Sequence, residues 1–191
     1  MNHIALFDRI APFYAWFYAH QRKAYAKASS RIIDRYPVGS TLLDVGCGTG
    51  ALSALLSRHF VVHAVDGAAQ MIKHAKRLHP STSITFSVAN LLEGLPFKDH
   101  SMDVVITSFV MHGLAPLERL KALDELHRIA KHHVIIVDYH QGRHVVIDFV
   151  ERLENGHYFS FIETFTDDLK KRFTQVEIIP LNSTSALYFI K

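Results

Sequence analysis

One stretch of the chain combines a carboxylate with closely spaced glycines. An apolar run ends in Asp44, and Gly46, Gly48 and Gly50 then alternate with small residues. Glycines let a backbone approach a ligand closely, and the helical pattern that follows offers N–H groups at its first turn. Asp66 ends the next apolar run about 20 positions after Gly46, where a carboxylate suits the hydroxyls of a ribose. The stretch therefore predicts a strand, a glycine loop and a helix that together cradle a small ligand.

A second group of reactive side chains follows two later apolar runs. His112 comes after the run at 103–109, and Tyr139 and His140 follow the run at 133–138. Ligands of open parallel sheets bind at the carboxyl ends of strands, so these side chains are candidates for moving a proton to or from a bound molecule. His112 is the first candidate for a base or a substrate contact. A structural or surface role is the alternative for each of them.

The elements that would position these residues alternate regularly. The pattern predicts strands at 41–45, 61–65, 84–88, 103–109 and 133–138, and helices from about 49, at 68–78 and at 116–130. This alternation predicts parallel strands with helices on both faces of the sheet. The apolar runs at 104–106 and 134–137 suit strands that are buried on both sides.

The two ends of the chain have different patterns. Residues 1–36 carry apolar and aromatic residues at helical spacing, with a break near Pro12, and form either helices packed on the sheet or a lid over a ligand site. Two helical patterns, at 145–153 and 166–173, precede strands at 175–179 and 186–190. The short link between these last strands predicts an antiparallel hairpin.

Composition narrows the class of protein. With 191 residues we expect one domain over 1–191, divided into a helical lid (1–36), a ligand-binding core (41–138), a cap (139–173) and a hairpin (174–191). The single cysteine excludes an internal disulfide and favours a reducing compartment. No apolar run is long enough to cross a membrane and no signal peptide is evident, which predicts a cytoplasmic protein.

Two classes of partner find no support in the sequence. The net charge is +3 and the Lys and Arg residues are scattered, so no nucleic-acid footprint is evident. His127, His132 and His133 lie close together, but their spacing does not suit a helical pair of metal ligands and no cysteine accompanies them. We therefore expect no metal site.

The glycine spacing alone leaves two cofactors open. Gly46-x-Gly48-x-x-Ala51 also satisfies the loose dinucleotide fingerprint, and both NAD and S-adenosylmethionine carry an adenosine. Asp44 would repel a pyrophosphate but would attract a cationic ligand with an ammonium and a sulfonium. The third glycine of the loop and the lack of room for a separate catalytic domain also favour S-adenosylmethionine.

The motifs resemble those of a known family. Leu42–Gly50 is similar to the first motif of class I S-adenosylmethionine-dependent methyltransferases, and Val65–Met71 is similar to the second. Leu95–Val105 resembles the approach to the family's fourth strand. The resemblance covers roughly 41–138 and implies a Rossmann-like α/β fold, with a mostly parallel seven-stranded sheet, one antiparallel strand in a C-terminal hairpin and S-adenosyl-L-methionine as cofactor. The opening Phe7–Tyr14 is similar to ubiquinone/menaquinone-type methyltransferases, although Ala15 replaces their usual aspartate.

The resemblance also implies roles for individual residues. Asp44, Gly46, Cys47 and Gly48 would line the methionine half of the cofactor. The ribose and adenine would meet residues that follow the second and third strands, namely Asp66, Gly67, Met71, Asn90 and Leu91, where Asn90 replaces an aspartate that many relatives have. Ser108, Phe109 and Tyr14 would complete the site around the methyl donor.

These observations lead to a functional prediction. We expect metal-independent, in-line methyl transfer to a small apolar or aromatic acceptor. No Asn-Pro-Pro-Tyr-like run follows the fourth strand, which disfavours a nucleobase acceptor, and that strand does not end in aspartate, which disfavours a metal-dependent catechol site. The alternatives are a non-catalytic module that binds S-adenosylmethionine and an NAD-dependent oxidoreductase. The accepting atom and the oligomeric state are not determined by the sequence.

Overall fold

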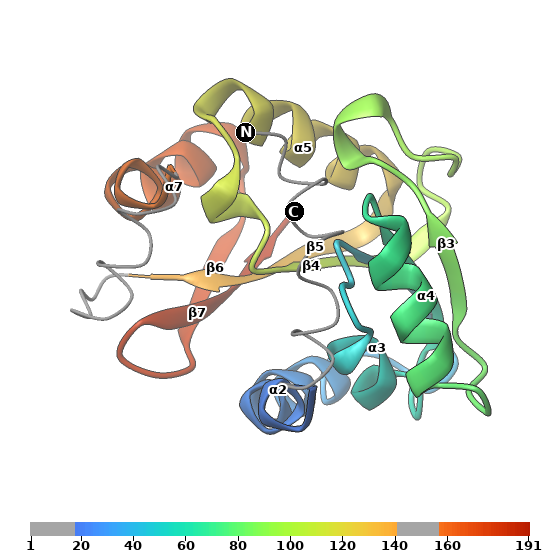
Figure 1. Cartoon of the computed structure of the whole chain (residues 1–191). Helices are drawn as coiled ribbons and strands as arrows, with labels where there is room; N and C mark the ends of the chain where they lie inside the picture. The colour runs from blue at the N-terminus through green and yellow to red at the C-terminus, as the bar shows by residue number, and fades with distance from the viewer. Residues whose placement is uncertain (1–17, 141–156) are drawn as a thin grey trace.

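The computed structural model describes residues 18–140 and 157–191, with the backbone alone for 18–24. Its seven strands form one sheet in the order β3-β2-β1-β4-β5-β7-β6 (Figure 1). The strands are β1 (Thr41–Val45), β2 (Val61–Asp66), β3 (Thr85–Val88), β4 (Met102–Ser108), β5 (Ala130–Tyr139), β6 (Val176–Pro180) and β7 (Ser185–Ile190). Strands β1 to β5 are parallel, and β7 is antiparallel to both β5 and β6. The predicted sheet, with its single antiparallel strand, is confirmed.

Helices cover both faces of the sheet because each central strand is apolar on both sides. Helices α2 (Tyr18–Ile33), α3 (Ala51–Leu56) and α4 (Ala69–Leu78) pack on one face, and α5 (Pro116–Ile129) and α7 (Tyr158–Arg172) pack on the other (Figure 1). Successive residues of β1 illustrate the alternation, since Leu42 belongs to the first core and Leu43 to the second. None of the described helices is long and apolar enough to cross a membrane.

One segment of the predicted organisation has different bounds in the structure. The helix predicted at 166–173 begins at Tyr158, because Phe161, Phe165 and Leu169 form an apolar stripe at helical spacing and are buried against the sheet. This part of the predicted cap is thus a core helix. In α2, Ala28 and Ile32 are likewise fully buried. Tyr14, the rest of 1–17 and the helix predicted at 145–153 lie outside the described residues.

Candidate functional site

The predicted site residues meet at one edge of the sheet. Parallel strands β1, β2, β4 and β5 all end there, which places Asp44, Asp66, Ser108 and Tyr139 along the same edge. The glycine loop follows β1, and a short 3-10 helix, η2 (Met111–Gly113), follows β4. The sheet topology therefore brings the glycine loop beside the segment that carries His112.

Four backbone N–H groups of the glycine loop donate hydrogen bonds to other groups of the protein. Gly46 and Cys47 both donate to the carbonyl of Val65, at 2.8 and 3.0 Å. Gly48 donates to Oδ2 of Asp66 at 2.8 Å, and Gly50 donates to the carbonyl of Cys47 at 2.9 Å. A phosphate cradle needs several N–H groups that converge on the ligand. This loop does not offer them from those four residues, which argues against a pyrophosphate-containing cofactor.

Asp44 lies beneath this loop with an incomplete set of partners. Its side chain is fully buried, and its Oδ2 accepts a hydrogen bond from Oγ of Ser53 at 2.5 Å. No hydrogen-bond donor among the described residues reaches Oδ1. Burial, only partly offset by the Ser53 hydrogen bond, raises the pKa of Asp44 to about 7. A buried carboxylate with an unsatisfied oxygen is the feature that a bound cation would complement.

In contrast to Asp44, Asp138 at the end of β5 has hydrogen-bond donors to both of its carboxylate oxygens. It too is fully buried, but its carboxylate accepts four hydrogen bonds. The N–H groups of Met111 and His112 bond Oδ2, while the N–H of Tyr139 and Nδ1 of His112 bond Oδ1, the last at 2.8 Å. The carboxylate therefore fixes both the η2 backbone and the imidazole ring. Because a carboxylate only accepts, Nδ1 of the neutral imidazole donates to Asp138, which assigns the ring's lone pair to Nε2.

Aromatic rings surround this imidazole. The ring centroids of Phe109, Tyr139 and Phe161, which we call the ring cluster, lie 6.3, 4.8 and 6.3 Å from that of His112, all in edge-on arrangements. Phe109 has a φ of +52°, a conformation that a bulky side chain rarely adopts and that strained functional positions often show. The site thus combines an imidazole held by a carboxylate with apolar walls.

Comparison with known proteins bears on this arrangement. Residues 42–133 match the model of a family described as a methyltransferase domain. The chain is 28% identical to 2-phytyl-1,4-naphtoquinone methyltransferase from Nostoc sp., over 97% of the chain and 91% of the relative. It is 31% identical to demethylmenaquinone methyltransferase from Porphyromonas gingivalis, over 67% of the chain and 53% of that relative.

Among solved structures, a DhpI–SAH complex superposes with a TM-score of 0.76 at 17% identity, over 98% of this chain and 94% of that one. The chain is a class I S-adenosylmethionine-dependent methyltransferase. The geometry of the glycine loop fits the cationic cofactor of this family, because Asp44 is buried beneath the loop with an oxygen that no described residue satisfies.

Two glycines of this methyltransferase's loop differ in the space around them. Gly48 has a φ of +53°, and a Cβ placed on it would meet nothing within 4 Å. Gly46 is different, because a Cβ there would lie 2.4 Å from Cγ2 of Val110. Cys47 is buried with its thiol turned to the Gly48 carbonyl, and burial raises the pKa of the thiol well above its ordinary value, which suits a packing residue rather than a nucleophile.

The residues implied to hold ribose and adenine occupy the ends of β2 and β3. Besides binding Gly48, Asp66 accepts a hydrogen bond from the N–H of Ala68 at 2.8 Å, so its carboxylate is fixed in place. Asn90 begins the 3-10 helix η1 (Leu91–Glu93), where its Oδ1 accepts from Leu92 and its Nδ2 donates to Glu93. Gly67 and Leu91 are partly exposed, whereas Met71 is buried in α4.

His140, the other histidine predicted to act on a bound molecule, contacts Tyr188 rather than the rings around His112. Nδ1 of His140 lies 3.0 Å from the hydroxyl of Tyr188 on β7, and that hydroxyl donates to the carbonyl of Tyr139 at 2.7 Å. Burial lowers the pKa of His140. These contacts brace the end of β5 against β7, whereas the ring of Tyr139 itself lies against His112.

Two further residues at this edge were not singled out by the sequence reasoning. The hydroxyl of Tyr25 on α2 lies 3.3 Å from Oγ of Ser108. Arg119 on α5 is 1% exposed, donates from Nη2 to the carbonyl of Leu114, and lies over the ring of Phe161 at 5.0 Å. Helical spacing with Ala122 and Leu123 could have placed Arg119 on the buried face of α5, but nothing in the sequence pairs Tyr25 with Ser108.

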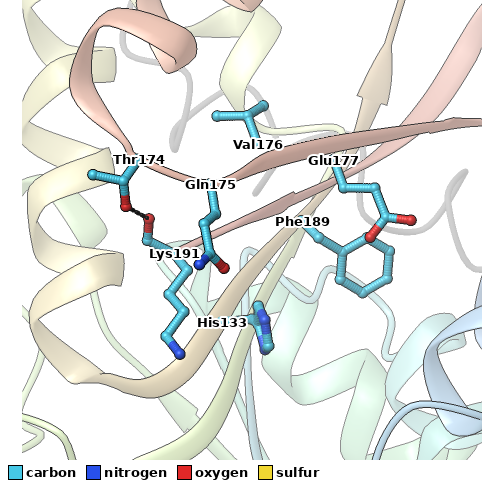
Figure 2. A pocket seen from close by; sticks show the side chains of 7 residues that line it. All are labelled: His133, Thr174, Gln175, Val176, Glu177, Phe189 and Lys191. Atoms are coloured by element: carbon cyan, nitrogen blue, oxygen red, sulfur yellow. Dashed lines mark hydrogen bonds between the residues drawn. The ribbon is translucent and has the colours of Figure 1, made fainter.

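The protein also has a hollow at the opposite edge of the sheet. Its volume is about 360 Å³, and it is lined by His133, Thr174, Gln175, Val176, Glu177, Phe189 and Lys191 (Figure 2). These residues lie in the first half of β5, in and just before the start of β6, and at and just after the end of β7. Glu177 already pairs with Arg35 at 2.6 Å, and the hollow is separate from the site described above.

Proposed function

We propose that this methyltransferase transfers a methyl group to a small aromatic acceptor that carries an ionisable hydroxyl, of the hydroquinone or phenol class. The observation that carries the proposal is the His112–Asp138 pair inside the ring cluster. Aromatic side chains bind a flat ring through edge and face contacts, and they keep water away from the reacting atoms. The names of the relatives from Nostoc and Porphyromonas, both quinone methyltransferases, support the same class of acceptor.

The cofactor would occupy the glycine loop, between Asp44 below and Asp66 at its side. Asp44 would complement the ammonium of its methionine half, and Asp66 would accept hydrogen bonds from the ribose hydroxyls. The bound cofactor supplies a methyl group that is already activated on a sulfonium. The protein's contribution is therefore to hold the acceptor in line with that methyl group, and positioning of this kind is worth up to ~7–11 kcal/mol of the barrier.

His112 would act on the acceptor's proton. Its Nε2 would take the proton of the hydroxyl, while the Nδ1–H bond to Asp138 stabilises the imidazolium that forms. The electron pair left on oxygen, or delocalised onto a ring carbon, would form the new bond to the methyl group as the methyl–sulfur bond breaks and S-adenosylhomocysteine leaves. If the ring carbon were the acceptor, its C–H proton would then be lost to restore the aromatic ring. General base catalysis of this kind contributes roughly 10²–10⁴-fold. The scheme needs no metal ion, in keeping with Ser108 rather than an aspartate at the end of β4.

The test is an acceptor screen with S-adenosylmethionine labelled in its methyl group. Reduced 1,4-naphthoquinol and simple phenols are compared with aliphatic carboxylates of similar size, and products are identified by mass spectrometry. We expect transfer to the hydroxylated rings and a loss of at least about 100-fold in His112→Gln, with binding of S-adenosylhomocysteine unchanged. Transfer to the carboxylates alone, or full activity in His112→Gln, would refute the proposal.

A further inference from the structure

The end of the glycine loop is held by a residue from a different part of the chain. His79 follows α4 immediately, is 8% exposed, and its Nε2 lies 3.1 Å from the carbonyl oxygen of Thr49. A carbonyl only accepts hydrogen bonds, so the imidazole donates through Nε2. This bond links the helix after β2 to the loop after β1, across 30 positions of sequence.

The bond fixes one peptide unit from both sides. The carbonyl of Thr49 and the N–H of Gly50 belong to the same planar peptide group. His79 bonds the carbonyl, and the N–H donates to the carbonyl of Cys47 at 2.9 Å. With both of its polar atoms engaged, this peptide has a defined orientation, and Gly50 has the φ of +77° from which α3 begins.

The ring of His79 is itself held in place. It stacks on Phe86 of β3, with ring centroids 5.9 Å apart and planes 20° from parallel. Gly50 lies against this stack, since a Cβ on Gly50 would come within 3.0 Å of the Phe86 ring and 3.2 Å of Cδ2 of His79. The imidazole therefore cannot move without disturbing either β3 or the loop.

We propose that His79 is a positioning residue for the cofactor, which holds the Thr49–Gly50 peptide in the orientation that the bound cofactor requires. The inference rests on the proposal that the glycine loop holds the cofactor. It assigns the effect to the hydrogen-bond donor of His79 rather than to the packing of its ring.

Two substitutions separate the donor from the ring. His79→Phe keeps an aromatic ring against Phe86 and removes the donor, whereas His79→Gln places an amide N–H at a similar reach and removes the ring. The matched control is His59→Phe, because His59 also bonds a backbone carbonyl, that of Tyr36 at 2.6 Å, and packs on a neighbouring phenylalanine. His59 lies just before β2, at the other end of that strand from Asp66.

The measurement is the affinity for S-adenosylhomocysteine by titration calorimetry, together with the melting temperature of each variant. We expect His79→Phe to bind about five- to tenfold more weakly, His79→Gln to bind within about twofold of the wild type, and His59→Phe to melt earlier with its affinity unchanged. Unchanged affinity in His79→Phe, or an equal loss in both His79 variants, overturns the inference. Asp66→Ala tests the underlying proposal, because unchanged affinity there would mean that the loop is not the cofactor site.

Discussion

Asp44 gives the site a dependence on pH that a single substitution can isolate. Its pKa is raised to about 7 in the folded protein by burial, against an ordinary value of 3.8. Between those two values the folded state keeps a proton that the unfolded state has lost. The free energy of unfolding therefore falls as pH rises through this window, and the full destabilisation is present above pH 7.

The size of the effect follows from the two pKa values. Between pH 5 and pH 8, Asp44 alone should lower the free energy of unfolding by about 2–3 kcal/mol. Asp44→Asn removes this contribution, whereas other titrating groups, including the many histidines, affect both proteins alike. Ser53→Ala should make the free energy of unfolding fall further between pH 5 and pH 8, because the hydrogen bond from Ser53 lowers the pKa of Asp44.

Urea unfolding of the three proteins at pH 5 and pH 8, followed by circular dichroism, measures these differences. A second assay links them to function. If a cofactor ammonium meets Asp44, binding of S-adenosylhomocysteine at pH 6.5 should release a proton, which calorimetry in two buffers of different ionisation enthalpy detects. Equal pH dependence in the wild type and Asp44→Asn would refute the reasoning about burial, and proton uptake on binding would refute the assigned contact.

Three other predictions test separate parts of the structure. Gly46→Ala should destabilise the protein by several kcal/mol, because the φ of Gly46 is +73° and the added Cβ would meet Val110. Gly48→Ala should cost only about 1–2 kcal/mol of stability and should mainly weaken binding of S-adenosylhomocysteine. Urea unfolding and calorimetry on both variants measure these effects, and similar results at the two positions would contradict the loop geometry. Asp138→Asn should lower the rate of methyl transfer at least about tenfold and should destabilise the protein by ~1–3 kcal/mol. The reason is that the amide nitrogen cannot accept the hydrogen bonds that the carboxylate accepts. Turnover measured with the wild type as control checks this, and unchanged turnover would separate Asp138 from catalysis. Arg119→Met should leave the free energy of unfolding unchanged or raise it by about 1 kcal/mol, because Nε and Nη1 of Arg119 have no hydrogen-bond partner among the described residues. Urea unfolding measures this. A fall in the free energy of unfolding of more than ~2 kcal/mol would show that the buried guanidinium is stabilising.

The order of the elements was predictable because it depends on local patterns. The strands at 41–45 and 61–65, the helix at 116–130 and the closing hairpin follow from runs of apolar residues and from short links, and their bounds in the structure differ by a few residues at most. The larger miss was α7, for which the sequence predicted only the second half. Its first half carries Tyr158 and Phe161, which are buried where their rings meet Tyr139 of β5 and His112 of η2.

The contacts that define the candidate site were less predictable. His112 was singled out after a predicted strand, whereas Asp138 was only the last residue of the predicted strand at 133–138. Their pairing spans 26 positions and requires β4 and β5 to be neighbours in register. Tyr25 and Ser108 are 83 positions apart, and only the packing of α2 on the sheet brings them together. Side-chain partners across elements depend on that packing, which no local spacing encodes.

The sequence by itself determined the glycine loop, the carboxylates before and after it, and hence the class of cofactor, because these features lie within single strand–loop–helix units whose geometry is local. The tertiary structure decided what those carboxylates do. It left Asp44 buried, with one oxygen that no described residue satisfies. It gave Asp138 four hydrogen bonds, one of them from the imidazole of His112, and it placed His79 against the loop. Burial and long-range contacts set charge and orientation, and both arise only when distant segments pack together.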